Sequence, residues 1–543
     1  MSKKTRLLLI TLSFFWFLAQ VPAVFYGTQK LAIHMSYVGD EQAPINGALK
    51  ILQDKSIFGL RNAQTVYYGP LFSIIALPAV VADFAEKMLL GKIHSALDYR
   101  DYIIWDWGGI VWKARLISVL FSFLILVILF KLFSTKTFNP KGNKLLPIVA
   151  PLILASNFIF FEYGHVFKHW IFVLFSLAGM LYSVVRLYET NEKKYYTHSF
   201  LYTIFGFGVS YLNGIFLIMW LPLLIKSIKN KKYQDLKRFF IFATILVVAA
   251  AVVVVWNPHP FVRLLGLSTG DITNSDTSSF SSEKSPIGFS FGYYSRVLIN
   301  NEFALLIAVA ILLVYLCTQR KIYNEPAFYF LVLPLLVFFG IFGVIGHHES
   351  RYVLPSMLLI LVLCTFLLSR YFTGIGKKNK YISVILVTLI SFSAAFNLMI
   401  IGLNISIQAK GPKEMALIKD LKEIQIKEPL SKTLVVKYYL LGTAHTKDAY
   451  RDYIGRTNKT GVNLYKFILG MDIPTEHVPL SAYYAIPDGF KLTEDLMKRY
   501  DHIAYYYEFA AENRGSVEPD YFDLHPLYFL YHKALSDYYY FIK

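Results

Sequence analysis

The segment GHHESRYVLP, residues 346–355, places two histidines, a glutamate and an arginine within five positions between two long apolar stretches. Charged side chains beside a bilayer are costly and usually have a function. Glu349 and Arg351 can pair with each other as a structural clasp. Together with His347 and His348 they can instead form a pocket for an anionic, hydroxyl-rich donor or acceptor at the membrane surface. The sequence leaves both interpretations open.

Two further polar groups lie close to the ends of apolar stretches. Asp40 and Glu41 follow the first stretch in SYVGDEQAP, and Lys113 and Arg115 begin the second in WKARLIS. The two carboxylates can be solvated surface, or Asp40, supported by Glu41, can be a general base that takes a proton from a hydroxyl or amine. The two cations can extend to lipid headgroups. Alternatively, Arg115 binds a phosphate, which suits its planar and permanently charged guanidinium.

A fourth polar group occupies the short segment FEYGHVFKHW, with Glu162, His165, Lys168 and His169. On a helix, His165 and His169 would share one face, because they are four residues apart. Such a pair can hold a metal ion, but no third ligand is close in the sequence, so we assign no metal site and treat a divalent metal as an alternative. Binding of a phosphate or of sugar hydroxyls is the favoured interpretation, and plain interfacial polarity is the other.

The composition restricts the class of protein. Of the 543 residues, 55% are hydrophobic and only 17% are charged, against about 25% in an average soluble protein. Long apolar runs recur from residue 7 to residue 403, which indicates a polytopic membrane protein. The net charge of +18 does not require a nucleic-acid partner, because the basic residues gather in short loops, as the positive-inside rule demands. Cys317 and Cys364 lie inside apolar runs and offer no disulfide framework.

The apolar runs predict about eleven transmembrane helices. The N-terminal run resembles a signal peptide but is long, so we interpret it as an uncleaved first span. Residues 70–90 contain two prolines and three charges, which suit a helix on the membrane surface. Within 198–229, a tight turn at Asn213 and Gly214 is predicted to join two short helices; one tilted helix would place the next basic loop on the wrong side. The predicted spans are 7–26, 114–133, 145–161, 170–188, 198–212, 214–229, 238–256, 302–318, 327–345, 352–369 and 381–403.

With this topology, all basic loops share one side of the membrane. The other side receives the first loop 27–113, the segments 162–169 and 257–301, the turn at 346–351, and everything after about residue 404. Residues 405–543 are polar and contain a helix-like run, PKEMALIKDLKEI, and the β-like runs TLVVKYYLL and HIAYYYEF. The predicted fold is therefore an all-α membrane bundle, residues 1–404, followed by a small extracytoplasmic α/β domain, residues 405–543.

The four polar groups then lie on one side and at about one depth. A carboxylate base, cations and hydrogen-bonding histidines at a lipid–water boundary suit the transfer of a sugar from a lipid-linked phosphate. The cations would stabilise charge on the leaving phosphate, and the carboxylate would activate the acceptor. No P-loop or dinucleotide-binding motif is present in a strand–helix context. The expected partners are the bilayer, a lipid-phosphate-linked sugar and a glycan, lipid or protein acceptor.

Several motifs resemble those of the GT-C superfamily of integral-membrane glycosyltransferases over roughly residues 1–404. They are GDEQ, YYGPLFSII, KARLIS, FGFGVSYLNGIF and HHESRYVLP. The last is similar to the H-x-E-x-R-Phe/Tyr motif of dolichyl-phosphate-mannose-dependent mannosyltransferases. The resemblance implies inverting transfer from a polyprenyl-phosphate sugar, with mannose favoured, Asp40 as base and Arg115 at the phosphate. It implies an extracytoplasmic or lumenal site, in the cell (inner) membrane of a bacterium or the ER membrane of a eukaryote.

The chain departs from the family pattern in two places. Lys168, His169 and Trp170 stand where many members carry a second acidic residue, and Glu162 is nearby but offset. This departure puts a two-carboxylate site and a metal requirement in doubt. Asn213-Gly214 replaces a frequent Lys-Gly, which removes one cation.

The main alternative function is a transporter or flippase of lipid-linked sugars. Such a protein is expected to carry polar residues near mid-span and often inverted repeats. The predicted spans are mostly apolar, and their polar groups collect at one face, which favours an enzyme. A non-catalytic receptor or scaffold, with the outer domain as its working part, is a second alternative.

Overall fold

The computed structural model describes the membrane part of the chain almost completely and selected segments of the C-terminal part. The described residues are 3–26, 28, 39–57, 60, 68–103, 107–231, 233–256, 289–320, 322–344, 350–372, 379–410, 433–441, 475–481, 502–508, 526, 527, 530 and 539–542.

Each predicted span is helical, as expected for apolar segments that must satisfy their own backbone hydrogen bonds in a bilayer. The helices are α1 Lys3–Phe25, α5 Trp107–Leu132, α6 Leu146–Ala155, α7 Phe158–His165, α8 His169–Thr190, α9 Lys193–Val209, α10 Leu221–Lys229, α11 Tyr233–Trp256, α13 Phe289–Arg320, α14 Pro326–Val344, α15 Leu354–Phe372 and α16 Lys380–Lys410. Short 3₁₀ helices occur at η2 Tyr211–Trp220, η3 Ile322–Asn324 and η4 Ser350–Val353.

The chain is an integral multi-pass membrane protein. Among the described residues, seven helices are long and apolar enough to cross a bilayer, or eight if the pair α6–α7, bent by 71°, is one span. The number eleven for the crossings therefore stays a prediction. Helices α8 and α15 form the centre of the bundle, because 83% and 94% of their apolar windows are buried, whereas α11 is 6% buried and lies at the periphery.

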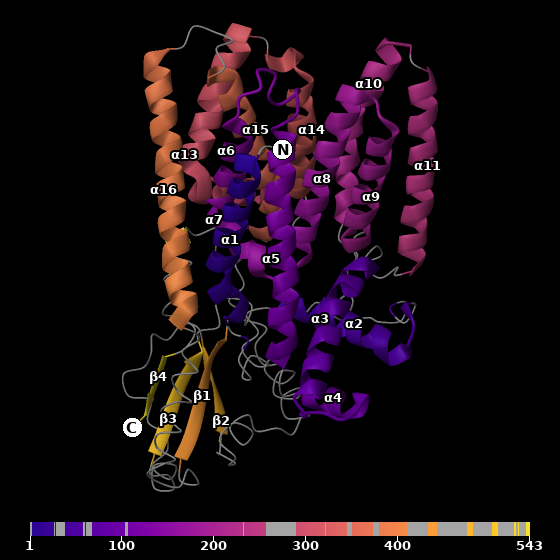
Figure 1. Ribbon diagram of the computed structural model, residues 1–543. Coiled ribbons are helices and arrows are strands. Elements are labelled where there is room, and N and C mark those ends of the chain that lie inside the picture. Colours follow the sequence, from indigo (N-terminus) through magenta and orange to yellow (C-terminus); the bar gives the residue numbers. More distant parts are fainter. Residues whose placement is uncertain are drawn as a thin grey trace.

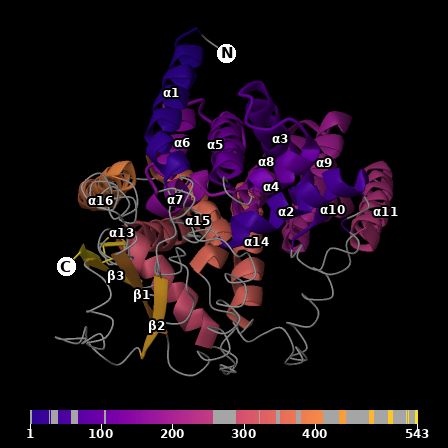
Figure 2. The ribbon, with the colours of Figure 1, turned by 90° about the horizontal axis from the view of Figure 1, so that it is seen from below.

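Three helices of the first loop lie beyond one end of this bundle. They are α2 Gly39–Asp54, α3 Pro70–Leu89 and α4 Ala96–Ile103, and Figure 1 shows them at the end of the molecule opposite to the N-terminus. Helix α3 covers the predicted surface helix 70–90 and is not among the candidate spans. The view from below places α2 and α4 across the ends of the spanning helices (Figure 2).

The four described strands lie at the same end of the molecule (Figure 1). They are β1 Thr433–Leu441, β2 Thr475–Ser481, β3 His502–Glu508 and β4 Tyr539–Ile542, in the order β2-β1-β3-β4. Strand β1 pairs in parallel with β2 and β3, and β4 is antiparallel to β3. The run TLVVKYYLL and residues 502–508 of the run HIAYYYEF are thus confirmed as strands. The expected helix PKEMALIKDLKEI lies outside the described residues, so the α/β class of this domain remains a prediction.

Two boundaries differ from the sequence predictions. The break in 198–229 is at Ser210, which is extended (φ −152°, ψ 124°), and Asn213 and Gly214 lie inside η2, so the predicted turn is wrong. The polar Asn213 is held in the helix because its Nδ2 donates to Ser176 Oγ at 2.5 Å. Helix α13 begins at Phe289, ahead of the predicted span start at residue 302, where its backbone leaves the helical conformation. Before this break, Tyr294, Val297 and Leu298 are buried.

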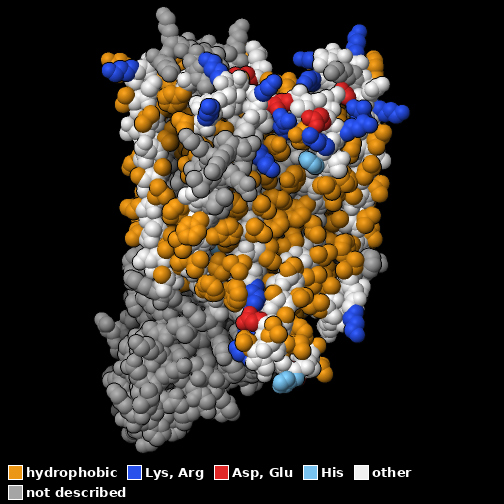
Figure 3. Space-filling model, in the orientation of Figure 1, with side chains coloured by type: hydrophobic (Ala, Val, Ile, Leu, Met, Phe, Trp, Pro, Cys, Tyr) orange, Lys and Arg blue, Asp and Glu red, His pale blue; other side chains and the backbone are white. Residues whose placement is uncertain are grey.

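The surface supports the predicted orientation. Figure 3 shows Lys and Arg side chains gathered at the end opposite to α2–α4, above a broad hydrophobic middle. The positive-inside rule then predicts that this basic end is cytoplasmic and that α2–α4 and the sheet are extracytoplasmic.

Cysteine labelling in cells tests this orientation. In a Cys317→Ser background, which removes the exposed native cysteine, we compare Lys92→Cys and Lys144→Cys, both at exposed positions. A membrane-impermeant maleimide should label the first in intact cells and the second only after permeabilisation. The reverse pattern would contradict the topology.

Candidate active site

A buried ion pair lies where α1, α2 and α5 meet. Arg115 Nε donates to Glu41 Oε1 and Oε2 at 3.1 and 3.2 Å, and Nη2 donates to Oε2 at 3.1 Å. Glu41 is 0% exposed and Arg115 is 3% exposed. Such a pair is stable in a low-dielectric interior only when further hydrogen bonds satisfy the remaining polar atoms.

The remaining guanidinium nitrogen supplies those bonds to the end of α1. Arg115 Nη1 donates to the carbonyls of Ala23, Val24 and Tyr26, at 3.2, 3.3 and 2.6 Å. The Ala23 and Val24 carbonyls are among the last four of α1, which have no partner inside the helix, and Tyr26 directly follows it. The cation also complements the helix dipole. All three guanidinium nitrogens are thus directed at protein groups. These contacts do not support the predicted phosphate contact of Arg115, and we assign this residue to holding Glu41.

Glu41 also fixes the segment between α7 and α8. Its Oε1 accepts the backbone N–H of Phe167 at 2.6 Å. Asp40 lies in the first turn of α2, directly before this anchored glutamate, although its side chain lies outside the described residues. The Glu41 carboxylate is therefore an anchor that holds Asp40's backbone beside residues 165–169.

The two histidines of this segment do not share a helix face, contrary to the prediction. Helix α7 ends at His165, Val166 and Lys168 are extended, and α8 begins at His169. The His165 Nδ1 atom lies 3.1 Å from Gln20 Oε1 in α1. The His169 ring packs against the Tyr68 ring at 4.4 Å between centroids. Lys168, between them, is 2% exposed.

The last polar group reaches the same region through aromatic contact. Trp170 packs edge-on against Tyr352, with 5.1 Å between centroids, and the neighbouring Arg351 is 9% exposed. His347, His348 and Glu349 lie outside the described residues. A continuous series of contacts thus runs from Glu41 through residues 167–170 to Arg351 and Tyr352.

Glu162 makes a contact on the far side of α7. Asn404 Nδ2 of α16 donates to Glu162 Oε2 at 2.5 Å, and Glu162 is 4% exposed. The carboxylate therefore joins α7 to α16.

Lys113 belongs to a second ionic cluster rather than to a headgroup contact. Its Nζ lies 2.6 Å from both Asp83 Oδ1 and Glu86 Oε2 of α3, and it is 8% exposed. The Lys113 hydrogen bond holds the pKa of Glu86 below its ordinary value of 4.5. Tyr99 of α4 donates to Asp83 Oδ2 at 3.1 Å. This cluster attaches the surface helices α3 and α4 to α5.

The start of α3 is seated on the glycine-rich end of α9. The Gly69 N–H donates to the Val209 carbonyl at 3.0 Å. A Cβ atom on Gly69 would lie 2.2 Å from the Gly208 carbonyl oxygen, so only glycine allows this approach. The contact holds Tyr68, and with it the ring that packs on His169.

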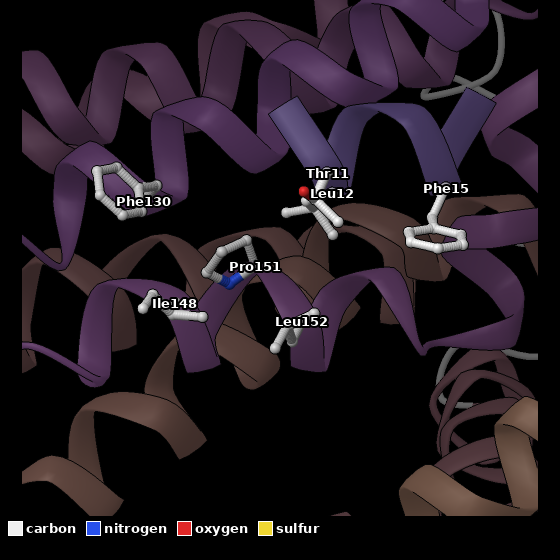
Figure 4. Close-up of a pocket in the computed structure, with 7 residues that line it drawn as sticks. All are labelled: Thr11, Leu12, Phe15, Phe130, Ile148, Pro151 and Leu152. Carbon is white, nitrogen blue, oxygen red and sulfur yellow. The ribbon is translucent and has the colours of Figure 1, made fainter. Parts of the chain in front are cut away.

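Neither a metal cluster nor the apolar pocket adds to this site. Within the described ranges, no three His, Cys, Asp or Glu side chains are grouped to hold a metal ion. A pocket of about 230 Å³ lies between α1, α5 and α6 and is lined by Thr11, Leu12, Phe15, Phe130, Ile148, Pro151 and Leu152 (Figure 4). Thr11 is about 20 Å along α1 from the carbonyls that Arg115 binds, so the pocket is separate from the polar region.

Several residues of this region are not evident from the sequence. Gln20 sits inside the first apolar run, and Tyr68 and Trp170 look like ordinary interfacial aromatics. The Phe167 contribution is a backbone N–H, which no side-chain pattern can indicate. Asn157 offered a signal, since an asparagine before an apolar run is a common helix N-cap, and it caps α7 by accepting from the Phe160 N–H at 2.8 Å.

The fold and the site together define a multi-pass membrane protein with a polar region at one end of its bundle. This region is assembled from α1, α2, α5, the α7–α8 link, the start of α8 and η4. Residues 290–445, which run from α13 to β1, match the model of the Alg9-like mannosyltransferase family. This match confirms the resemblance to membrane mannosyltransferases for less than half of the chain.

Among solved structures, the chain is similar to the crystal structure of ArnT from Cupriavidus metallidurans in the apo state. The identity is 10%, the TM-score is 0.46, and the similarity covers 91% of this chain and 92% of that one. Similarity at this level says nothing about the activity of the present chain. A search among curated proteins found no match.

The Glu41–Arg115 pair makes a prediction for stability. Glu41→Gln leaves the buried guanidinium without its counter-charge, which should cost about 3–5 kcal/mol of unfolding free energy, measured by thermal unfolding in detergent. Glu192→Gln is the control, because Glu192 pairs with Lys194 on the surface, and exposed pairs contribute little. Equal melting temperatures for all three proteins would contradict a stabilising role.

Glu86 makes a prediction for the pH dependence of stability. Because the pKa of Glu86 is lowered in the folded protein, its ionised form stabilises the fold above its ordinary pKa of 4.5. This contribution is lost as the pH falls through the lowered folded pKa. The melting temperature of wild type should therefore exceed that of Glu86→Gln at neutral pH, and the difference should shrink in acid. A difference independent of pH would exclude the ionised pair as its cause.

Proposed function

We propose that this protein is a membrane glycosyltransferase that moves a sugar, with mannose favoured, from a polyprenyl-phosphate donor to an acceptor at the extracytoplasmic surface. The observation that carries the proposal is the series of contacts that joins Glu41 and Arg115 to the segment 165–170 and to Tyr352. It brings groups from four distant parts of the chain to one end of the bundle. The family match over residues 290–445 supports the same class of reaction.

The chemistry needs a base on one side of the sugar and cations on the other. The acceptor oxygen attacks the anomeric carbon while the bond from that carbon to the phosphate oxygen breaks. We assign Asp40 as the base that takes the acceptor proton. It directly precedes Glu41 in the first turn of α2, so the anchored glutamate holds the backbone of Asp40 while the Asp40 carboxylate serves as the base. Attack from the face opposite to the phosphate inverts the anomeric configuration.

The leaving group is a polyprenyl phosphate that gains one negative charge as the bond breaks. Lys168 and Arg351 are the cations assigned to that charge, since both are buried, at 2% and 9% exposed, and their neighbours Trp170 and Tyr352 are in contact. Charge developing in a water-poor site is stabilised more by a fixed cation than it would be in water. His165 and His169, on either side of Lys168, are assigned to the sugar hydroxyls or the phosphate, and His347, His348 and Glu349 to the donor or acceptor pocket.

A transporter or flippase of lipid-linked sugars is the alternative. Its expected sign, a polar group at mid-span, occurs at Glu302 inside α13, the first residue of the predicted span 302–318. The Glu302 carboxylate is 2% exposed and accepts from Asn157, Ser393 and Asn397. Because protein donors surround it, this carboxylate does not line a passage, and the observation favours the enzyme.

Asp40→Asn tests the proposed base, with Asp54→Asn at the other end of α2 as its matched control. Asp54 pairs with Lys50 on the surface at 3.0 Å. Loss of a general base should slow transfer about a hundredfold or more, whereas the control should keep wild-type activity. Both variants should melt at the wild-type temperature.

The assay follows labelled sugar from a polyprenyl-phosphate mannose into acceptors of the native membrane, in proteoliposomes. Full activity of Asp40→Asn would remove Asp40 as the base. Movement of the intact donor across the bilayer by wild type, without transfer of its sugar, would establish the transporter instead.

A further inference from the structure

A buried carboxylate deep in the membrane part stands apart from the proposed site. Glu302 lies near the middle of the apolar window of α13, Phe291–Thr318, and its backbone leaves the helical conformation there (φ −137°, ψ 35°). Ser393 Oγ donates to Glu302 Oε2 at 2.8 Å, and Asn397 Nδ2 donates to Oε1 at 3.0 Å. Asn157 Nδ2 also donates to Oε1. An ionisable residue inside the membrane with such partners is usually there for a function.

The two asparagines connect this carboxylate to the beginning of α7. Asn157 Oδ1 accepts the Phe160 N–H at 2.8 Å, and Asn397 Oδ1 accepts the Phe158 N–H at 3.0 Å. These N–H groups belong to the first turn of α7 and have no partner within the helix. Each side-chain amide therefore accepts from α7 with its oxygen and donates to Glu302 with its nitrogen. The Glu302 carboxylate can only accept, so it determines the orientation of both amides.

The position of this cluster matters because α7 is short and bent away from α6. The two helices meet at 71°, and the eight residues of α7 span about 12 Å. At its other end follow His165, the Phe167 N–H that binds Glu41, and Lys168. A change of tilt at the first turn of α7 is thus carried directly to the proposed phosphate-binding residues.

We propose that Glu302 is a positioning residue for the transfer reaction. Through Asn157 and Asn397 it fixes the bend between α6 and α7, and so sets where Lys168 and His169 meet the donor phosphate. This inference rests on the proposed function for its catalytic consequence, but the placement of α7 can be measured without any substrate.

The first readout is geometric. Glu162 of α7 and Asn404 of α16 are in hydrogen-bond contact at 2.5 Å, so cysteines at both positions should cross-link readily in a Cys317→Ser, Cys364→Ala background. Glu302→Leu removes the oxygen to which both asparagine amides donate, and we expect the rate of cross-linking to fall several-fold. Ser393→Ala, a milder change to the same cluster, should give a smaller fall.

Glu325→Leu is the matched control. Glu325 accepts from Arg370 Nε at 2.6 Å, so this variant also removes a carboxylate that joins helices, but without a link to α7. It should lower the melting temperature and leave cross-linking unchanged. Glu302→Gln keeps an oxygen for both asparagine amides and turns its NH₂ to the Ser393 hydroxyl, which can accept, so this conservative variant should cross-link at close to the wild-type rate.

The second readout is binding of a prenyl phosphate, the leaving group common to donors of this class, by the intact protein in detergent. Glu302→Leu should weaken binding about tenfold, and Glu302→Gln should retain it. Unchanged cross-linking in Glu302→Leu and Ser393→Ala would overturn the positioning role even if stability falls. If wild type binds no prenyl phosphate, the proposed function fails, while the cross-linking result still decides whether Glu302 places α7.

Discussion

The Glu41–Arg115 ion pair is the interaction on which the outer end of the bundle depends. Burying both charges is costly unless every polar atom finds a partner, and the partners here come from different segments: the last carbonyls of α1 and the Phe167 N–H between α7 and α8. One pair therefore joins the first span, the first outer helix, the second span and the segment that carries Lys168. Asp40 owes its place to this pair, because it adjoins Glu41 at the start of α2.

Polar contacts position the helices of this protein more than apolar ones do. Lipid tails are as apolar as leucine, so spanning helices gain little from hiding apolar surface and are oriented by close packing and hydrogen bonds. Helix α7 illustrates this: Glu302 acts at its first turn through two asparagines, Gln20 and Asn404 bind its middle, and Glu41 binds just beyond its end. Outside the bundle, the Asp83–Lys113–Glu86 cluster and the Gly69–Gly208 approach hold α3 in the same way.

The sequence predicted the parts that follow from composition and period. Apolar runs marked the helices, the charges in 70–90 marked α3 as a surface helix, and two β-rich runs marked strands. It failed where a contact decides the outcome. His165 and His169 fall on different helices because the chain is extended between them, and Asn213 stays inside η2 because Ser176 accepts its amide proton. Glu302 was predicted at the start of a span. The three buried donors that hold its carboxylate inside the bundle are 90 or more residues away in the sequence, so no local pattern indicates them. The partners of Arg115, Glu41 and the end of α1, are likewise far away in the sequence.

The most direct test of the central claim is a cryo-electron microscopy structure with a non-hydrolysable polyprenyl-phosphate sugar. We expect the phosphate to lie beside Lys168 and Arg351, with the anomeric carbon facing the first turn of α2 and the Glu41–Arg115 pair intact. A phosphate bound at the basic end of the bundle, or one in direct contact with Arg115 after loss of the Glu41 pair, would contradict it.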